Sequence, residues 1–280
     1  MIDLQALTRS ANTLEALPAS VTRLASIAAK DSWNVREVEE VVSLDQALSF
    51  RLLRMANSAA SASLMPIVTI RDAVVRLGLG SLLSLATATS VQKKLTSAIP
   101  EYGLSEGELW RHSVAAALAA ESAPAFCDVE LPPETFASAL LHDIGKLILS
   151  RELAPDVLSL LALAREQGHL SSLKAESKIL GVHHGELGGL IAQHWGLPER
   201  LVRGIIHHHT PDDAQDIIAD VVHVANLAAK QVGAGHWALE EDKQVNAASV
   251  SRLKMGDNGF DALCARVAKR LEQVLSQYGA

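Results

Sequence analysis

The sequence predicts an all-α fold, and three observations carry that prediction. Of its 280 residues 49% are apolar but only 4% are aromatic, so Ala, Leu, Val and Ile must build the core. Ala and Leu are among the strongest helix formers. Apolar residues recur at helical spacing along the chain, whereas β-branched residues rarely alternate with polar ones as they would in a strand.

The first 105 residues form the N-terminal helical part of the predicted fold. Several stretches there have the apolar spacing of a helix that buries one face, and the last of them ends at a glycine that is able to cap it. These stretches are Val21–Ala28, Val35–Val42, Asp45–Asn57 and Ile70–Leu77, the last closed by Gly78.

Two further parts complete the predicted organisation. Gly103 and Gly107 mark a boundary near residue 105, and the helical pattern then continues through a core over residues 106–235. Residues 236–280 form a polar loop followed by an amphipathic helix, Phe260–Tyr278, which we expect to fold back on the core.

Charge, cysteine content and the N-terminus exclude several classes of protein. A net charge of −7 argues against a DNA-binding protein held by phosphate neutralisation. Cys127 and Cys264 are too far apart for a zinc knuckle and fit a reducing compartment. The N-terminus lacks the compact apolar run of a signal peptide, and the uncharged run Leu77–Gln92 is too short to span a bilayer. We therefore expect a soluble, cytoplasmic protein with no membrane association.

The distribution of histidine is the most informative feature of the chain. All eleven histidines lie between His112 and His236, and the first 111 residues contain none. This asymmetry indicates that the N-terminal part serves packing and that the middle part holds polar chemistry.

Two of the histidine motifs combine an imidazole with a carboxylate. Glu108 and His112 stand at i, i+4 and share one helical face, which is more often a surface pair than a ligand pair. His142 and Asp143 follow a strongly apolar stretch, so a buried pair needs compensation. A metal ion would supply it, and the Asp143 carboxylate is able to bridge two ions. The alternative is a helix end with Asp143 as a cap before Gly145.

The remaining motifs are also ambiguous when taken singly. His183 and His184 stand among glycines that permit close helix packing, and they are either a helix start or a source of one inward ligand. Consecutive imidazoles at 207–209 precede Pro211, where the helix dipole favours histidine even without a metal. Asp220, His223 and Asn226 share a predicted helix and mean little alone.

Together these motifs indicate a metal site with nitrogen and oxygen ligands, a donor set that suits Fe, Mn, Zn or Ni. We expect the isolated His169, His194 and His236 to serve surface or packing roles. The chain has neither the G-x-S-x-G elbow of a serine hydrolase nor a glycine-rich phosphate loop.

The motifs also resemble a known family. The segment Leu141-His-Asp-Ile-Gly-Lys146 is similar to the signature of the HD phosphohydrolase superfamily. The order of the other motifs resembles its HDOD branch, the HD-related output domain of bacterial signalling proteins. The matching segments are Leu17-Pro18, Val41–Leu48, Leu52–Ser58, Ile70–Gly78, Leu109–Ser113, Gly181–Gly188, Trp195–Pro198 and His208–Pro211.

This resemblance implies a ligand set for divalent metal. The superfamily ligands fall on His112, His142, Asp143, His184, His208 and His209. Glu108 matches an additional ligand of the related HD-GYP cyclic-di-GMP phosphodiesterases, and Lys146 matches their phosphate-contacting lysine. In a catalytic member Asp143 and Lys146 would be the catalytic residues.

Two departures from the superfamily pattern bear on activity. The closing Asp ligand falls on Asn226, a neutral group that binds metal more weakly than a carboxylate. Thr210-Pro-Asp-Asp213 follows His209 where the phosphodiesterases carry Gly-Tyr-Pro. The resemblance therefore implies a metal-binding signalling output domain that acts through a ligand or through a signalling partner or regulatory module. The alternative is a metal-dependent phosphohydrolase that takes a nucleotide or other phosphate ligand.

Overall fold

The computed structural model describes residues 4–58, 66–153, 155–167, 170–234 and 244–277. These residues form helices and contain two isolated β-bridges but no strand, which confirms the all-α prediction. The α-helices are α1 (Leu4–Ala11), α2 (Ala19–Ala28), α3 (Val35–Ser43), α4 (Gln46–Ala56), α5 (Ile70–Leu95), α6 (Glu108–Ser122), α7 (Thr135–Leu141), α8 (Lys146–Glu152), α9 (Pro155–Glu166), α10 (Ser172–Leu180), α11 (His184–His194), α12 (Glu199–Ile206), α13 (Pro211–Ala214), α14 (Ile217–Gln231), α15 (Ala247–Arg252) and α16 (Gly259–Gln277).

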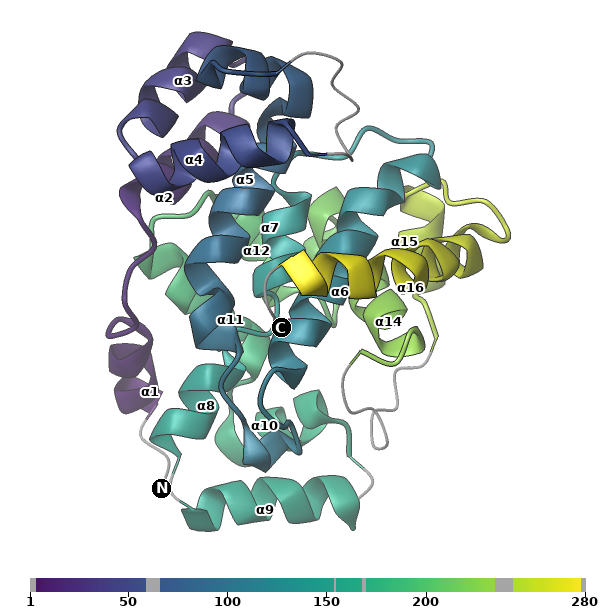
Figure 1. Cartoon of the computed structure of the whole chain (residues 1–280). Coiled ribbons are helices and arrows are strands. Elements are labelled where there is room, and N and C mark those ends of the chain that lie inside the picture. Colours follow the sequence, from purple (N-terminus) through teal and green to yellow (C-terminus); the bar gives the residue numbers. More distant parts are fainter. Residues whose placement is uncertain (1–3, 59–65, 154, 168–169, 235–243, 278–280) are drawn as a thin grey trace.

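Helices α2 to α4 and the start of α5 form a block at one end of the molecule (Figure 1). The side chains of Asn34 and Asp45 accept hydrogen bonds from the backbone N–H groups of Glu37 and Leu48, so each caps the helix that follows it. Leu24, Val42 and Leu52 are fully buried, as the helical spacing predicts. We call α2, α3, α4 and the start of α5 as far as Gly78 the N-terminal block.

Helix α5 departs from the prediction at Gly78. The glycine has the positive φ of 79° expected of a residue that ends a helix. A second helical segment nevertheless begins at once, because Leu79, Leu82 and Leu83 extend the buried apolar surface beyond the kink. Among the described residues α5 is the one helix that is long and apolar enough to cross a membrane. Half of its apolar stretch is nevertheless buried in the fold. Helix α5 packs there against α2, α3, α4 and α7.

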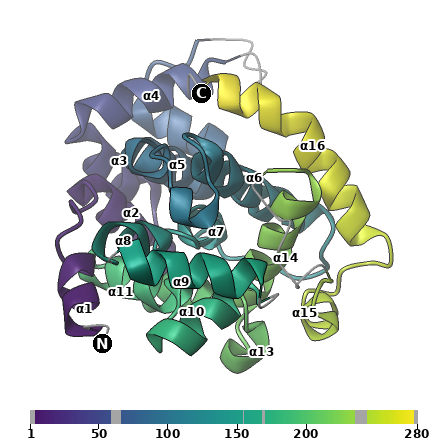
Figure 2. The same ribbon diagram turned by 90° about the horizontal axis from the view of Figure 1, so that it is seen from below.

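Helix α6 forms the centre of the second part of the molecule. It packs against α7 and α14, while α11 and α12 pair beside them, and Trp110 of α6 is fully buried. Seen from below, α16 runs along the outside of α6 (Figure 2). Ion pairs from Arg111 to Glu272 and from Arg270 to Glu121 join these two helices, which confirms that the last helix folds back on the core.

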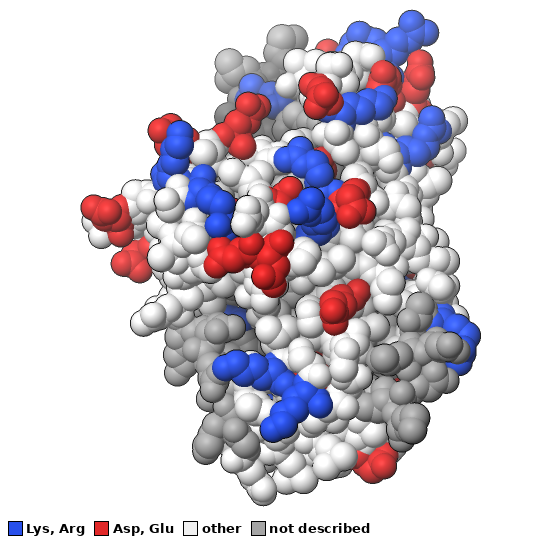
Figure 3. All heavy atoms as spheres, turned by 180° about the vertical axis from the view of Figure 1, so that it is seen from behind, with Lys and Arg blue, Asp and Glu red and all other residues white. Residues whose placement is uncertain are grey.

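The surface has no single dominant sign of charge on the side opposite to Figure 1. Acidic and basic side chains are interspersed there rather than gathered into one patch (Figure 3). The interior of the second part is formed where α6, α7, α11, α12 and α14 pack together, and the histidine motifs lie there.

Candidate metal centre

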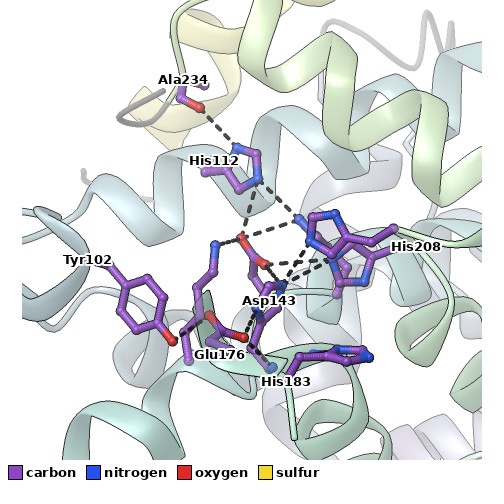
Figure 4. Close-up of polar contacts among 12 residues, drawn as sticks. Tyr102, His112, Asp143, Glu176, His183, His208 and Ala234 are labelled. Carbon is purple, nitrogen blue, oxygen red and sulfur yellow. Dashed lines mark hydrogen bonds and ion pairs between the residues drawn. The ribbon is translucent and has the colours of Figure 1, made fainter. Parts of the chain in front are cut away.

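Segments that are far apart in the sequence bring their imidazoles together in the interior. His112 comes from α6, His142 and Asp143 follow the last residue of α7, and His184 begins α11. His208 and His209 follow the end of α12. His112, His142, Asp143, His184 and His208 are each at most 2% exposed. Figure 4 shows His112 and His208 turned toward Asp143.

The first potential ligand group is formed by His112, His142 and Asp143. The Nε2 atoms of His112 and His142 lie 3.1 Å apart. Oδ2 of Asp143 lies 3.5 Å from Nε2 of His112 and 3.4 Å from Nε2 of His142. Nδ1 of His112 lies 2.9 Å from the carbonyl oxygen of Ala234, and Nδ1 of His142 lies 2.7 Å from that of Ala139. A carbonyl only accepts hydrogen bonds, so Nδ1 carries the proton in both rings. Each Nε2 therefore keeps a lone pair for a metal.

The second potential ligand group is formed by His184, His208 and His209. Nε2 of His184 lies 3.4 Å from that of His208 and 3.0 Å from that of His209. The other carboxylate oxygen of Asp143, Oδ1, lies 3.3 Å from Nε2 of His184 and 3.9 Å from Nε2 of His208. The two oxygens of Asp143 therefore face different groups of imidazoles, the arrangement of a carboxylate that bridges two ions.

Glu176 and Tyr102 support the second group and were missed by the sequence analysis. Oε2 of Glu176 accepts hydrogen bonds from the backbone N–H and from Nδ1 of His184, both at 2.7 Å, and Oε1 accepts one from the Tyr102 hydroxyl at 2.8 Å. Burial alone would raise the pKa of Glu176, but His184 and these hydrogen bonds hold that pKa below its ordinary value. A carboxylate behind a ligating histidine fixes its ring and tautomer. The available signal was an acid on the buried face of α10, beside Ala175 and Leu180.

His223 supports the backbone at His208. Its Nδ1 donates to the carbonyl oxygen of His208 at 2.9 Å, and its Nε2 accepts from the backbone N–H of Asn246 at 3.2 Å. Asp220, on the same helix, instead pairs with Arg252 at 2.6 Å and so joins α14 to α15. Of the residues in the predicted α14 motif, His223 thus supports the site, whereas Asp220 holds α14 against α15.

Asn226 is buried one turn further along α14. It is 3% exposed, and its Oδ1 has no hydrogen-bond partner among the described residues. A buried acceptor without a partner is costly, and a cation would satisfy it. The unpartnered oxygen therefore fits the expected role of Asn226 as a neutral metal ligand.

The structure does not bring Glu108 into either ligand group. Its carboxylate instead accepts a hydrogen bond from the backbone N–H of Ser105 at 2.5 Å, in the turn that precedes α6. Glu108 does share a helical face with His112, but the backbone N–H of Ser105 competes for its carboxylate.

Lys146 lies inside the cluster. Its Nζ is 2.7 Å from Oδ2 of Asp143 and 5.5 Å from the centre of the Tyr102 ring, and the residue is 5% exposed. Burial alone would raise the pKa of Asp143, but Lys146 and the surrounding imidazoles hold that pKa well below its ordinary range. Burial lowers the pKa of His112, His142, His208 and His209. The ionised form of Asp143 and the neutral forms of these four imidazoles are thus favoured, which is the protonation state that metal binding requires.

Glycines allow the segments of the cluster to touch, as the sequence predicted. A Cβ at Gly145 would lie 1.9 Å from the carbonyl oxygen of His184, and a Cβ at Gly189 would lie 2.3 Å from the Ile206 side chain. Only glycine permits these approaches, so the turn after α7 rests directly on the start of α11 and α11 rests on α12.

The other histidines lie outside the cluster or outside the described residues. His183 caps α11 and forms a capping box with Glu186, so the helix-start interpretation holds for His183 while His184 faces the cluster. His194 is exposed, as expected. His169 and His236 are not among the described residues.

Comparisons with known proteins agree with this arrangement. The family model of the HDOD domain matches residues 14–211. An uncharacterised protein of Treponema pallidum is 25% identical over 76% of this chain and 42% of its own length. Ribonuclease Y of Thermus thermophilus is 32% identical over 46% of this chain and 22% of its own length. The matched chain thus spans less than half the length of these relatives.

Solved structures share the fold. A protein from Shewanella amazonensis, named as a candidate phosphohydrolase, is 27% identical with a TM-score of 0.65, over 95% of this chain and 94% of its own. An HDOD domain protein of unknown function from Geobacter sulfurreducens is 22% identical with a TM-score of 0.66, over 98% and 95% of the two chains. The HDOD family model matches most of the chain, and the helical fold and the His/Asp cluster agree with that match. The chain therefore belongs to the HDOD family.

Proposed function

We propose that this chain is a signal-transduction output domain of the bacterial cytoplasm, with a divalent-metal centre that serves ligand sensing and structure more than catalysis. The observation that carries the proposal is the burial of the His/Asp cluster. Hydrolysis on a metal needs water and a phosphate group at an open coordination position. His142, His184 and His208 are fully buried, and Lys146 is already paired with Asp143.

The donor set supports metal binding itself. One ion would be held by His112, His142 and Asp143, a second by Asp143 with His184, His208 and His209, and Asn226 would supply a neutral oxygen. An ion bound there would neutralise Asp143 and could act as a Lewis acid. Fe, Mn, Zn and Ni all suit imidazole and carboxylate ligands.

The N-terminal block and the loops beside its helices supply a surface for a partner. Among the described residues five of the seven exposed large apolar side chains lie there: Trp33, Leu44, Phe50, Val68 and Val75. Exposed apolar side chains that gather in one part of a molecule are typical of interaction surfaces. The partner in this proposal is a signalling protein or regulatory module.

A metal-dependent phosphohydrolase is the second candidate, and Lys146 favours it. A buried ammonium group beside a metal-bridging carboxylate is placed to hold a phosphate oxygen. That activity would need the cluster to open, and the neutral Asn226 and the absent Gly-Tyr-Pro segment argue against turnover of cyclic-di-GMP.

The test pairs metal analysis with activity assays on the purified chain. We expect Fe, Mn, Zn or Ni by elemental analysis and no useful turnover of cyclic-di-GMP or bis-p-nitrophenyl phosphate. Robust metal-dependent hydrolysis that Asp143→Ala abolishes would move the chain into the enzyme class.

A cellular assay separates the two candidates further. Arg71 of α5 pairs with Glu39 of α3 on the exposed surface, so Arg71→Glu alters the N-terminal block far from the cluster. We expect Arg71→Glu to abolish the signalling phenotype while the folded protein keeps its metal. A phenotype that followed Asp143→Ala alone, together with a measurable hydrolase rate, would defeat the signalling proposal.

A further inference from the structure

A cavity separate from the metal cluster lies where the N-terminal block meets the core. Its volume is about 340 Å³, within the range of small-molecule pockets. Helices α5, α6, α7 and α16 and the end of α4 contribute to its walls. Helix α16 runs past α6 (Figures 1 and 2). The described lining residues are Met55, Ser58, Leu77, Ser81, Ser84, Leu85, Ala88, Val114, Leu118, Glu121, Phe136, Leu140, Arg270, Gln273 and Val274.

Apolar side chains make up most of the walls. Leu85 comes from α5, Leu118 from α6, Phe136 and Leu140 from α7, and Val274 from α16. A cavity of roughly 150 Å³ with apolar walls already binds a molecule of the size of benzene. The larger space here suits a correspondingly larger apolar group.

The polar side of the cavity is electrically balanced. Arg270 donates to Glu121 at 2.7 Å and to the Ser122 hydroxyl at 3.1 Å, and the Arg270 and Glu121 side chains remain 39% and 37% exposed. Because the two charges are paired, this part of the wall favours neither an anion nor a cation. A guanidinium has five N–H groups and a carboxylate has several lone pairs, so both retain capacity for a ligand that donates and accepts.

Other polar groups of the lining are uncharged. The Ser84 hydroxyl donates to the carbonyl oxygen of Gly80, which leaves its oxygen able to accept, and Ser81 and Gln273 add a hydroxyl and an amide. A neutral head group with both a donor and an acceptor matches this wall.

We propose that this cavity binds a small uncharged amphipathic molecule. Its apolar body lies against Leu85, Leu118 and Phe136, and its amide or hydroxyl head lies at Arg270 and Glu121. The site goes beyond the proposed metal function, because none of the described lining residues belongs to either ligand group.

Three probes with the same alkyl chain test the head-group requirement. Octanamide, octanoate and octylamine are titrated into the full chain by calorimetry. We expect octanamide to bind and the two charged probes to bind at least several-fold more weakly. Tighter binding of octanoate or octylamine than of octanamide, or no binding of any probe, would overturn the proposal.

Variants then locate the binding. Arg270→Met should weaken octanamide binding about tenfold, the effect of losing a hydrogen bond to a charged group. Arg266→Met is the matched control, because Arg266 stands on the same helix but contacts the Phe126 ring and not the cavity. Equal binding by both variants and the unmodified chain contradicts the assignment.

A second variant fills the space. Ala88→Phe places an aromatic ring in the cavity and should abolish octanamide binding, while elemental analysis shows an unchanged metal content. If Ala88→Phe does not fold, the comparison of Arg270→Met with Arg266→Met decides alone, since Arg270 is partly exposed. Full binding by a folded Ala88→Phe protein would refute the site, whatever the state of the metal centre.

Discussion

The N-terminal block and the histidine-bearing core are both helical, but they are stabilised in opposite ways. The N-terminal block buries aliphatic side chains such as Leu24, Val42 and Leu52 and keeps its ion pairs on the surface, as between Arg71 and Glu39. The core buries a carboxylate, an ammonium group and several imidazoles in its centre. Buried polar groups cost stability unless every one is satisfied, whereas exposed ion pairs contribute little. The core is therefore the part of the chain in which the loss of a single polar partner is expected to cost the most stability.

The largest expected effect comes from breaking the buried pair of Asp143 and Lys146. Asp143→Ala leaves the Lys146 ammonium buried without its carboxylate, which should cost about 3–5 kcal/mol of unfolding free energy. Urea unfolding in the presence of a chelator measures it. The matched change in the N-terminal block, Glu39→Ala, should cost no more than about 1 kcal/mol. Equal costs would erase the contrast between the two parts.

The pH dependence of stability follows from the buried imidazoles. Burial places the pKa of His112, His142, His208 and His209 below the ordinary 6.5 in the folded chain, so the unfolded chain binds protons first as the pH falls. Stability is therefore present above about pH 6.5 and is lost below it, by up to about 1.4 kcal/mol per pH unit for each such histidine.

Unfolding of the metal-free chain between pH 7.5 and about 5.5 provides the measurement. His208→Gln should make the dependence shallower, and His194→Gln, at an exposed position, should leave it unchanged. A stability that stays flat below pH 6.5 would show that the cluster histidines are not held neutral by burial.

The next largest expected effect is a loss of metal affinity when Glu176 is changed. Glu176→Gln weakens the hydrogen bond that orients His184, and removal of such a supporting carboxylate typically lowers metal affinity 10–100-fold. Tyr102→Phe removes only the hydrogen bond to Glu176 and should have a smaller effect. Competition with a chelator reports both, and Glu37→Gln on the surface of the N-terminal block is the control. An unchanged affinity in Glu176→Gln would separate His184 from the metal.

The smallest expected effect is a gain in metal affinity when Asn226 is changed. Asn226→Asp adds a charged oxygen where an uncharged, unpartnered one is now buried, and it should tighten metal binding several-fold because a carboxylate is the stronger ligand. The same chelator competition measures it. If affinity and metal content are both unchanged, Asn226 lies outside the coordination sphere.

Sequence reasoning succeeded where local pattern and structure coincide. Helical spacing located α2, α3, α4 and α16, because the buried face of each helix repeats along the chain. The structure brings most of the histidines predicted as ligands into two neighbouring groups, and their role as metal ligands stays a prediction.

The remaining features depend on tertiary contacts that spacing does not encode. The position of Glu108 one turn before His112 fits a shared site, but its carboxylate binds the backbone N–H of Ser105 in the preceding turn, a contact that helical spacing does not reveal. Glu176 is one acid among many until α10 packs against the start of α11. The continuation of α5 past Gly78 likewise reflects packing of Leu79 and Leu82 rather than local preference.

The contact between Gly145 and His184 has a kinetic consequence. Because backbone lies against backbone there, Asp143 and His184 can move apart only when the fold opens locally, so release of an ion held between them would follow the rate of that opening. Two populations of the same chain, folded in media that differ in metal, should then stay distinct long after they are mixed. The metal content of a folded molecule would then reflect the metals that were present when it folded.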